Sequence, residues 1–588
     1  MQVLLQAGKQ LCASRTKVLV LQAILLLGSA QASAQRLIAF PGAEGAGKYT
    51  SGGRGTATTP TTVYEVTSLD DTNTPGTLRY AMSQSATAAP HRTVVFRVCG
   101  TIHLLTQLRI PANTTLAGQT APGDGICLAD RPVTVNGSNV IVRFVRFRMG
   151  DRYQNIGMVD GAGSDDAFGG RFNLKTIVDH CSISWSTDEA CSFYQGDSTT
   201  LQWNLVSEPL DYSYHFEAGD TDFEHHGYGG VWGGRHASFH HNLIAHARGR
   251  NPRFSGSGGL TPAVASAENG DFRNNVIYNW GGYSTNGGEG GNYNMVNNYY
   301  KWGPSTGTGN TSGVAIKSMI FYPFFNAALP FPHAYLAGNY VDGYPNVTRN
   351  NWLGVAPGSA PRSDTAQVKV TTPFSIMPMP TQTAQDAYNS VLNQAGCVLP
   401  ARDVLDQRIV TDVRNRTSSI IDVQGGYPAH VTPYSVSQAA WPVLSCGAAP
   451  TDSDHDGMTD AYELANGLNP NNAADRQLIA ANGYTNLENY LNGIVNALLG
   501  SKAADAAEKA GLGVYPNPAH EQLTLTHPAS SQPVTLEIYS ADGRRVRTAA
   551  TLPGTATTAL PLAGLAPGVY LVRYASPKGA LTVKLLHE

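Results

Sequence analysis

The chain has 588 residues, too many for one ordinary compact domain, so we expect several domains or one elongated repeat fold. The 62 glycines and the low share of charged residues, 14%, favour a turn-rich, β-dominated protein over a helical one. The formal net charge of −3 argues against a nucleic-acid-binding protein, so an anionic partner must be held by local cations or by a bound metal.

The N-terminus has the pattern of a secretory signal peptide over residues 1–34. Arg15 and Lys17 precede an apolar run from Val18 to Leu27, and the small residues 32–34 form an Ala-x-Ala cleavage site. An apolar run of about ten residues is too short to span the ~30 Å hydrocarbon core of a membrane. We therefore predict an exported protein.

Six cysteines remain after the signal peptide is removed: Cys99, Cys127, Cys181, Cys191, Cys397 and Cys446. An even number of cysteines in an exported protein permits disulfides. The sequence leaves their pairing open, and buried free thiols are an equal alternative for any given pair.

From Thr93 to about Tyr340 the sequence consists of short β-type runs separated by polar turns. The runs are 113–117, 139–147, 175–183, 199–206, 237–244, 271–278 and 293–300. Their onsets recur at intervals of roughly 23 to 38 residues, in or near the range of solenoid repeats. A β-sandwich would show shorter and more even spacing, so the pattern favours a β-solenoid.

An asparagine recurs within or just after several of these runs. The positions are Asn204, Asn242, Asn275, Asn298 and Asn339. In a solenoid, residues at the same turn of successive coils stack on one another, and stacked asparagines satisfy backbone groups there. We therefore predict an asparagine ladder.

Several motifs in this region resemble bacterial family 1 pectate lyases. They are Phe40–Gly47, Gly52–Gly55, Val66–Asp71, Pro75–Arg79, Val94–Ile102, Ile177–Ser182 and Arg250–Arg253. The last is similar to the family's Arg-x-Pro-Arg segment. The resemblance covers roughly Phe40 to Tyr340. It implies a right-handed parallel β-helix that cleaves pectate, a galacturonate polymer, by β-elimination with Ca²⁺.

Such a reaction needs clustered carboxylates to hold Ca²⁺, because the cation must neutralise the substrate carboxylate next to the proton that is removed. Asp165 and Asp166 lie on one predicted coil, and Asp188 and Glu189 lie about one coil later. Oxygen-rich clusters of this kind suit Ca²⁺. The resemblance implies that Asp165 or Asp166 and then Asp188 are ligands. Ser192 stands where the family often has a further carboxylate, and two expectations follow: Glu189 compensates for it, or the affinity is weak and the ion binds only with the substrate.

The resemblance assigns catalysis to Arg250 and binding of a neighbouring uronate to Arg253. Free guanidinium has a pKa above ~12 and is a poor base, so a second hypothesis lets Arg250 position the intermediate while another group takes the proton. Arg253 would bind a carboxylate through its planar fork. The family's substrate-binding lysine is absent from residues 224–235. Its place is expected to be taken by Tyr228, His226 or Arg235.

Histidines in this region do not predict a transition-metal site. His240 and His241 are adjacent on a predicted strand, and neighbouring strand residues point to opposite faces. We therefore expect no converging pair there.

Residues 452–463 match the spacing of an EF-hand-like calcium loop. Oxygen-bearing side chains occupy loop positions 1, 3, 5, 9 and 12, Gly457 occupies the tight turn, and Met458 offers a carbonyl at position 7. The predicted ligands are Asp452, Asp454, Asp456, Met458, Asp460 and Glu463. We predict a structural calcium segment at 447–500, helical around Asp475 to Ala481 and Asn486 to Leu499.

A linker at 501–510 leads to a small β unit at 511–588. Its Tyr-Pro-Asn-Pro opening at 515–518, Asp-Gly-Arg turn at 542–544 and Pro-Gly-Val-Tyr strand at 567–570 resemble the C-terminal sorting domain of the type IX secretion system. The resemblance implies a β-sandwich, export across the outer membrane, and the secretion machinery as a partner. The other interpretation is a generic immunoglobulin-like accessory domain.

The predicted protein is thus all-β: a parallel β-helix lyase domain at 35–446, then a small calcium-loop segment and a C-terminal β-sandwich. We expect a secreted or cell-surface monomer that binds pectate, with Ca²⁺ as cofactor and no nucleic-acid partner. Two alternatives are a β-helix pectin hydrolase using paired carboxylates and a non-catalytic surface glycan-binding protein. The hydrolase is disfavoured because the Gly-His-Gly and Arg-x-Lys segments of polygalacturonases are absent.

Overall fold

The computed structural model describes residues 36–56, 58–255, 261–357, 365–495, 510–540, 545–576 and 579–587. The predicted signal peptide at 1–34 and nearly all of the predicted linker at 501–510 lie outside these ranges. No helix within them is long and apolar enough to cross a membrane.

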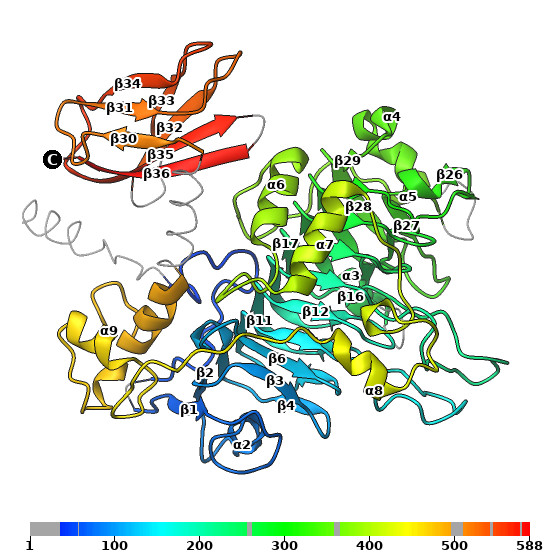
Figure 1. Ribbon diagram of the computed structural model, residues 1–588. Coiled ribbons are helices and arrows are strands. Elements are labelled where there is room, and N and C mark those ends of the chain that lie inside the picture. Colours follow the sequence, from blue (N-terminus) through cyan, green and yellow to red (C-terminus); the bar gives the residue numbers. More distant parts are fainter. Residues whose placement is uncertain are drawn as a thin grey trace, which may run out of the picture. The chain divides into compact units, whose positions relative to one another are not determined.

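Among the described residues, three parallel sheets of ten, nine and eight strands form a β-helix (Figure 1). The ten-stranded sheet contains, in spatial order, β1 (Thr62–Val66), β2 (Arg92–Phe96), β5 (Thr114–Ala117), β8 (Val140–Arg143), β11 (Leu174–Asp179), β14 (Asp197–Gln202), β17 (Ala237–His240), β20 (Asn269–Arg273), β23 (Asn292–Val296) and β28 (His333–Ala337). The nine-stranded sheet contains β3 (Gly100–His103), β6 (Ile126–Ala129), β9 (Arg146–Arg148), β12 (Ser182–Ser184), β15 (Leu205–Ser207), β18 (Leu243–Ala245), β21 (Val276–Tyr278), β24 (Tyr299–Lys301) and β29 (Tyr340–Val341). The eight-stranded sheet contains β4 (Leu108–Ile110), β7 (Val133–Val135), β10 (Phe168–Arg171), β13 (Cys191–Tyr194), β16 (Val231–Trp232), β19 (Arg253–Phe254), β22 (Thr285–Gly287) and β27 (Phe321–Pro323). The predicted parallel β-helix is confirmed.

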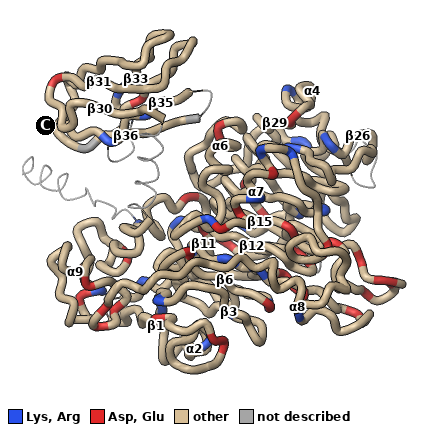
Figure 2. Tube along the Cα trace, viewed as in Figure 1, with Lys and Arg blue, Asp and Glu red and all other residues tan. Residues whose placement is uncertain are grey.

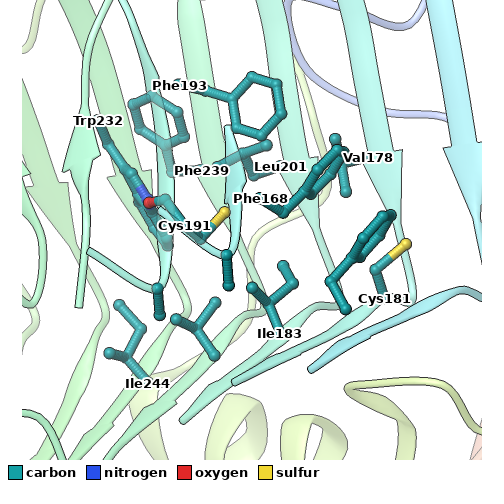
Figure 3. Close-up of a cluster of buried hydrophobic side chains, with 14 of the residues drawn as sticks. Phe168, Val178, Cys181, Ile183, Cys191, Phe193, Leu201, Trp232, Phe239 and Ile244 are labelled. Carbon is teal, nitrogen blue, oxygen red and sulfur yellow. The ribbon is translucent and has the colours of Figure 1, made fainter. Parts of the chain in front are cut away.

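The interior of the β-helix is a column of apolar side chains contributed by all three sheets. Figure 3 shows part of it, with Phe168, Phe193 and Trp232 from the eight-stranded sheet facing Val178 and Leu201 from the ten-stranded sheet. Because successive coils are in register, equivalent rings pack closely along the axis. Burying this continuous column is what stabilises a fold whose single coils have no core of their own.

The predicted asparagine ladder is present. Each side-chain oxygen accepts from the backbone N–H and the side-chain NH₂ of the asparagine one coil earlier, at 2.9–3.0 Å. The chain of bonds runs through Asn204, Asn242, Asn275, Asn298 and Asn339, and Asn351 continues it. All six side chains are buried, so the ladder satisfies turn amides that water cannot reach.

The residue before each ladder asparagine turns the chain sharply. Trp203, His241, Asn274 and Asn297 have φ of 54–57°, in the left-handed region. Six of the seven predicted runs are therefore two strands joined by a turn, one in the ten-stranded and one in the nine-stranded sheet, whereas the run 113–117 is β5 alone. The expectation that His240 and His241 point to opposite faces is wrong for this reason: their Nδ1 atoms lie 2.9 Å apart.

Two helices that the sequence did not predict, α6 (Ala384–Gln394) and α7 (Val404–Asn415), cover the nine-stranded sheet (Figure 1). Their apolar faces, including Leu392 and Ile409, pack against Leu205 and Leu243. A buried Arg148 in β9 binds Asp403, the N-cap of α7, over 2.7 Å. These contacts make residues 384–415 part of the same packed body as the β-helix.

The remaining helices are short. Within the described residues they include α2 (Leu78–Ser83), α3 (Pro262–Ser266), α4 (Pro345–Arg349), α5 (Thr365–Val368), α8 (Tyr434–Ser437) and α9 (Asp460–Ala465). A small hairpin, β25 (Asn310–Thr311) and β26 (Val314–Ala315), projects between β24 and β27.

One disulfide joins Cys99, beside the first coils, to Cys446, 347 residues later in the sequence. The cysteines at 127, 181, 191 and 397 are free and buried. The sequence left the cysteine pairing open. In the structure one disulfide links the early part of the predicted 35–446 unit to its end.

The predicted calcium segment packs on the first coils of the ten-stranded sheet. Met458 and Leu487 contact Val95 and Ala117, and Arg54 binds Glu488 over 2.6 Å. Residues 486–495 are helical, as predicted. The helix expected at Asp475–Ala481 is only a 3₁₀ turn over Asp475–Gln477, because residues 478–485 form a tight hairpin-like bridge instead.

The C-terminal unit is an antiparallel β-sandwich, as predicted. One sheet contains β30 (Gly513–Tyr515), β31 (Gln522–Thr526) and β34 (Thr557–Pro561); the other contains β32 (Thr535–Ser540), β33 (Arg545–Ala550), β35 (Gly568–Ser576) and β36 (Gly579–His587). Leu523, Leu536, Leu560 and Val572 form its own core.

Candidate active site

The candidate site is a column of residues that precede successive strands of the eight-stranded sheet. Asp166 precedes β10, Glu189 precedes β13, Tyr228 precedes β16 and Arg250 precedes β19. Parallel bridges join Glu189 to Tyr228 and Tyr228 to Gly249, so these residues stack coil upon coil. The regular repeat is what brings residues from distant parts of the sequence together.

Three of the four predicted carboxylates converge. Oxygens of Asp166, Asp188 and Glu189 lie within 4.8 Å of one another, and the Glu189 N–H donates to Asp166 Oδ1 over 3.2 Å. Asp165 takes a different neighbour, since its Oδ2 accepts from Gln154 Nε2 over 2.8 Å.

The electrostatics of this acidic cluster fit a divalent cation. Burial, followed by repulsion from Glu189, raises the pKa of Asp166 and of Asp188 well above the usual range. Both shifts mean that the site disfavours several negative charges in the absence of a counter-charge. Three carboxylates with oxygen donors at this spacing are the ligand set that Ca²⁺ prefers.

Arg250 provides the positive charge that the structure places against this cluster. Its guanidinium pairs with Glu189, lies 3.9 Å from Asp188 Oδ1, and has its Cζ 4.1 Å from the centre of the Tyr228 ring. Burial works against the charged form, but the carboxylates of Glu189 and Asp188 outweigh it and raise the pKa of Arg250. In this arrangement Arg250 is held as a cation.

His226 bridges two carboxylates beside the cluster. Its Nε2 lies 2.9 Å from Asp188 Oδ1 and its Nδ1 lies 2.9 Å from Glu224 Oε2. Its ring stacks on His215 with centroids 3.6 Å apart and an interplanar angle of 6°. Burial, followed by the neighbouring His226, lowers the pKa of His215 to about 4. His226, held by Glu224 and by stacking on His215, therefore positions the carboxylate of Asp188.

Sequence reasoning missed His215 and Glu224 as neighbours of the cluster. Both lie in the irregular segment 208–230, where no repeat predicts which residues meet. An antiparallel bridge between Tyr212 and His225 folds this segment back on itself. Only that fold-back brings His215 under His226.

The two other predicted substrate-binding arginines lie apart from each other. Arg253 is the first residue of β19, three residues after Arg250 on the same coil. Its Nη2 donates to the buried Glu289 over 2.6 Å. Arg235 is exposed in the turn that follows β16, at the opposite end of that strand from Tyr228. The geometry thus groups Tyr228 and His226 with the cluster, leaves Arg253 paired with Glu289 three residues after Arg250, and does not bring Arg235 to the cluster.

The predicted calcium loop is a second acidic cluster, beside α9 (Figure 2). Asp452, Asp454 and Asp456 offer oxygens within 4.8 Å of one another. Both carboxylate oxygens of Asp454 and of Glu463, and Oδ2 of Asp456, are buried with no hydrogen-bond partner. Asp460 instead accepts from Ser453, through N–H and Oγ, at 2.7 Å.

These orphaned oxygens fit a bound cation. Burial, together with repulsion within the group, raises the pKa of Asp456 and of Glu463 to about 7. The buried Asp475, which the twelve-residue pattern does not contain, also acts on both groups and has an unpartnered Oδ1. Asp475 is a candidate additional ligand that only the fold reveals.

The sequence is similar to curated relatives over most of its length. A "Probable pectate lyase C" from Aspergillus flavus is 32% identical over 467 residues, covering 78% of this chain and 94% of the relative. A protein of the same description from Aspergillus terreus is 31% identical over 471 residues, covering 79% and 95%. Residues 513–588 match the family described as a secretion system C-terminal sorting domain.

Solved structures of related shape are more distant. The major allergen from cedar pollen has a TM-score of 0.39 at 16% identity, covering 60% of this chain and 92% of the allergen. A Bacillus pectate lyase in complex with trigalacturonate has a TM-score of 0.36 at 15% identity, covering 60% and 98%.

Proposed function

Because this chain belongs to the pectate lyase family and is a polysaccharide lyase, we propose that it cleaves pectate by calcium-dependent β-elimination, giving 4,5-unsaturated oligogalacturonides. The observation that carries the proposal is the contact of Arg250 with Glu189 of the acidic cluster, two coils earlier. An inverting hydrolase would need two carboxyl groups about 6.5–9.5 Å apart with a water between them, whereas here Asp166, Asp188 and Glu189 offer oxygens within 4.8 Å of one another.

We propose that Asp166, Asp188 and Glu189 hold Ca²⁺, with Asp165 adjacent. When bound, the ion would neutralise the substrate carboxylate and stabilise the negative charge that develops beside it. Asp188 is kept in place by His226, and Glu189 by the stacking of its coil on Tyr228.

In this proposal Arg250 takes the proton from C5 of the galacturonate. Its pKa is raised chiefly by Glu189 and Asp188, so engaging both carboxylates with a cation removes the charges that hold Arg250 protonated. Tyr228 supports the guanidinium from one side, and Arg253 binds a neighbouring uronate once it exchanges Glu289 for the substrate. Arg235 is proposed only as a peripheral uronate contact.

The chain ends in a sorting domain that directs export by the type IX secretion system. We propose the functional parts as a lyase at 35–446, a structural calcium segment at 447–500 and a sorting unit at 511–588. The predicted ligands of the structural ion are Asp452, Asp454, Asp456, Met458, Asp460 and Glu463, of which Asp460 accepts hydrogen bonds from Ser453. The proposed working form is a monomer with pectate and the secretion machinery as partners.

The test follows ultraviolet absorbance of polygalacturonate incubated with the chain lacking residues 1–34, with Ca²⁺ and then with excess chelator. We expect a calcium-dependent rise from unsaturated uronates, lowered at least a thousandfold in Arg250→Ala because the proton acceptor is lost. Arg97→Ala, which removes an arginine far from the site, is the matched control. New reducing ends without unsaturation would mean hydrolysis, and binding without cleavage would mean a glycan-binding protein.

A further inference from the structure

The column of site residues does not end at Arg250. One coil beyond it, Tyr283 precedes β22, and one coil beyond that Tyr322 lies in β27. The register of β19 with β22 puts Tyr283 at the position of Arg250, and the register of β22 with β27 puts Tyr322 at the position of Asn286 and Arg253. The two tyrosines therefore continue the surface of Arg250 and Arg253 over the next two coils.

The tyrosine rings form a continuous surface. A side chain at Gly249 would place its Cβ 2.5 Å from Cε2 of Tyr283, so the glycine is what allows that ring to lie against the coil of Arg250. The Tyr283 and Tyr322 rings have centroids 5.8 Å apart and are tilted by 33°. Phe324 follows, with its centroid 5.2 Å from that of Tyr322.

Each ring is anchored on one side and half-exposed on the other. Tyr283 and Tyr322 pack against a small buried cluster of Val314, Met319 and Ala356, which fixes their orientation. Half-exposed aromatic rings held rigid in a row offer apolar faces at low conformational cost.

Arginines alternate with the rings. Arg250 lies over Tyr228, and Arg253 lies over Phe324 with its Cζ 4.9 Å from the ring centre. A uronate polymer presents the same two features at every unit: a carboxylate and an apolar C–H face of the sugar ring. Cations and aromatic faces in alternation along one axis therefore complement an anionic sugar chain laid along the coils.

We propose that Tyr283, Tyr322 and Phe324 form an aromatic track that binds the uronate units beyond the one held at Arg250, so that the protein prefers long chains to short ones. The inference rests on the proposed function, because it takes Arg250 as the point where the chain is cut. Adjacent coils are ~4.8 Å apart, so Tyr322 reaches units that a trimer centred on Arg250 leaves vacant.

The experiment measures two quantities on the chain lacking residues 1–34. Affinity for polygalacturonate is measured by affinity electrophoresis, which does not depend on cleavage, and kcat/KM is measured on polygalacturonate and on trigalacturonate. We expect Tyr322→Ala to lower affinity and kcat/KM for the polymer by about tenfold while trigalacturonate turnover changes by less than about twofold. Tyr283→Ala should lower polymer affinity by a similar factor.

Two further variants separate stacking from folding. Tyr322→Phe keeps the ring and should retain wild-type values. Tyr340→Ala is the matched control, because Tyr340 is also half-exposed and lies 4.8 Å from the neighbouring Tyr299 ring, but in the nine-stranded sheet. It should leave both quantities unchanged, and melting temperatures check that all variants fold.

The outcomes distinguish the track from the lyase. A wild-type chain that binds polymer but does not cleave it defeats the proposed function, while loss of binding in Tyr322→Ala still supports the track. Cleavage that is as fast on polymer in Tyr283→Ala and Tyr322→Ala as in wild type overturns the track and leaves the lyase standing. Equal loss in Tyr340→Ala also overturns it.

Discussion

Glu44 shows how one buried carboxyl group can make this fold sensitive to pH. It belongs to the segment before β1 that packs on the ten-stranded sheet, where its N–H donates to Gln202 Oε1 over 3.0 Å. Burial, followed by repulsion from Asp179, raises the pKa of Glu44 from 4.5 to about 7, although Lys48 opposes the shift. The folded chain thus keeps a proton that the unfolded chain releases.

A raised carboxyl pKa favours folding at low pH, so this contribution is complete below pH 4.5 and is lost as the pH rises to about 7. Glu44→Gln, which cannot ionise, should therefore match wild type near pH 4 and gain stability relative to it near pH 8. Urea unfolding across this pH range measures the difference. Glu217→Gln, at an exposed position, is the control. A Glu44→Gln difference that stays constant with pH would contradict the prediction.

Asn242 is an interior member of the asparagine ladder, bonded to Asn204 on one side and Asn275 on the other. Its Oδ1 accepts from both the N–H and the side chain of Asn204, and its own NH₂ donates to the Leu201 carbonyl over 2.9 Å. Asn242→Ala would leave these buried groups unpaired, so we expect the free energy of unfolding to fall by about 3 kcal/mol. Chemical denaturation measures it. Asn389→Ala on the exposed face of α6 should cost less than ~0.5 kcal/mol, and equal losses would count against the ladder.

Among the elements, the proposed calcium segment is the one whose stability should depend most directly on a ligand. Its acidic loop has orphaned oxygens, and the same segment packs through Met458 and Leu487 on β2 and β5. Binding a cation to the loop should therefore stabilise the first coils as well as the loop itself.

We expect Ca²⁺ at a hundred times its Kd to add about 2.7 kcal/mol to the stability of the unit that contains the loop. Calorimetry with and without chelator should show the melting temperature fall when the ion is removed. Glu463→Gln should abolish most of this shift while leaving the calcium dependence of cleavage intact, because the acidic cluster at Arg250 is separate. Asp70→Asn, at an exposed turn, is the control. An unchanged calcium shift in Glu463→Gln would show that the loop is not the binding site.

At the level of elements, residues that recur once per coil could be predicted from the sequence, and the irregular turns and loops between the strands could not. The asparagines and the carboxylates at 165–166 and 188–189 recur about once per coil, and a solenoid stacks such positions without further information. The left-handed turn at His241 and the 3₁₀ turn at Asp475 depend on local backbone geometry that a strand or helix pattern does not encode. His215 reaches His226 only through an irregular loop.

For the whole molecule, the features that the sequence did not predict are contacts between residues far apart in the chain. The Cys99–Cys446 pair closes a separation of 347 residues, and no local pattern chooses it among the possible pairings. The helices α6 and α7 likewise become predictable only when the nine-stranded sheet supplies an apolar face for them to cover. The fold class was within reach because the coils of the β-helix share a repeat and the C-terminal unit has its own motifs.

The sorting domain should be dispensable for chemistry and essential for export. Its core of Leu523, Leu536, Leu560 and Val572 is built from its own strands, so it does not rely on the β-helix to bury its apolar residues. Deleting residues 511–588 should therefore leave kcat/KM on polygalacturonate within about twofold of the full chain. In a host with a type IX secretion system, the deleted form should instead stay inside the outer membrane.

Cell fractionation with an activity assay on each fraction measures both effects in one experiment. The matched control replaces Leu552, an exposed residue of the same domain, with Ser and should be exported normally. Loss of activity in the purified deletion form would mean that the C-terminal sandwich supports the lyase directly. Export of the deletion form would mean that another part of the chain carries the export signal. Normal activity with failed export is the result that its self-contained core and its family match lead us to expect.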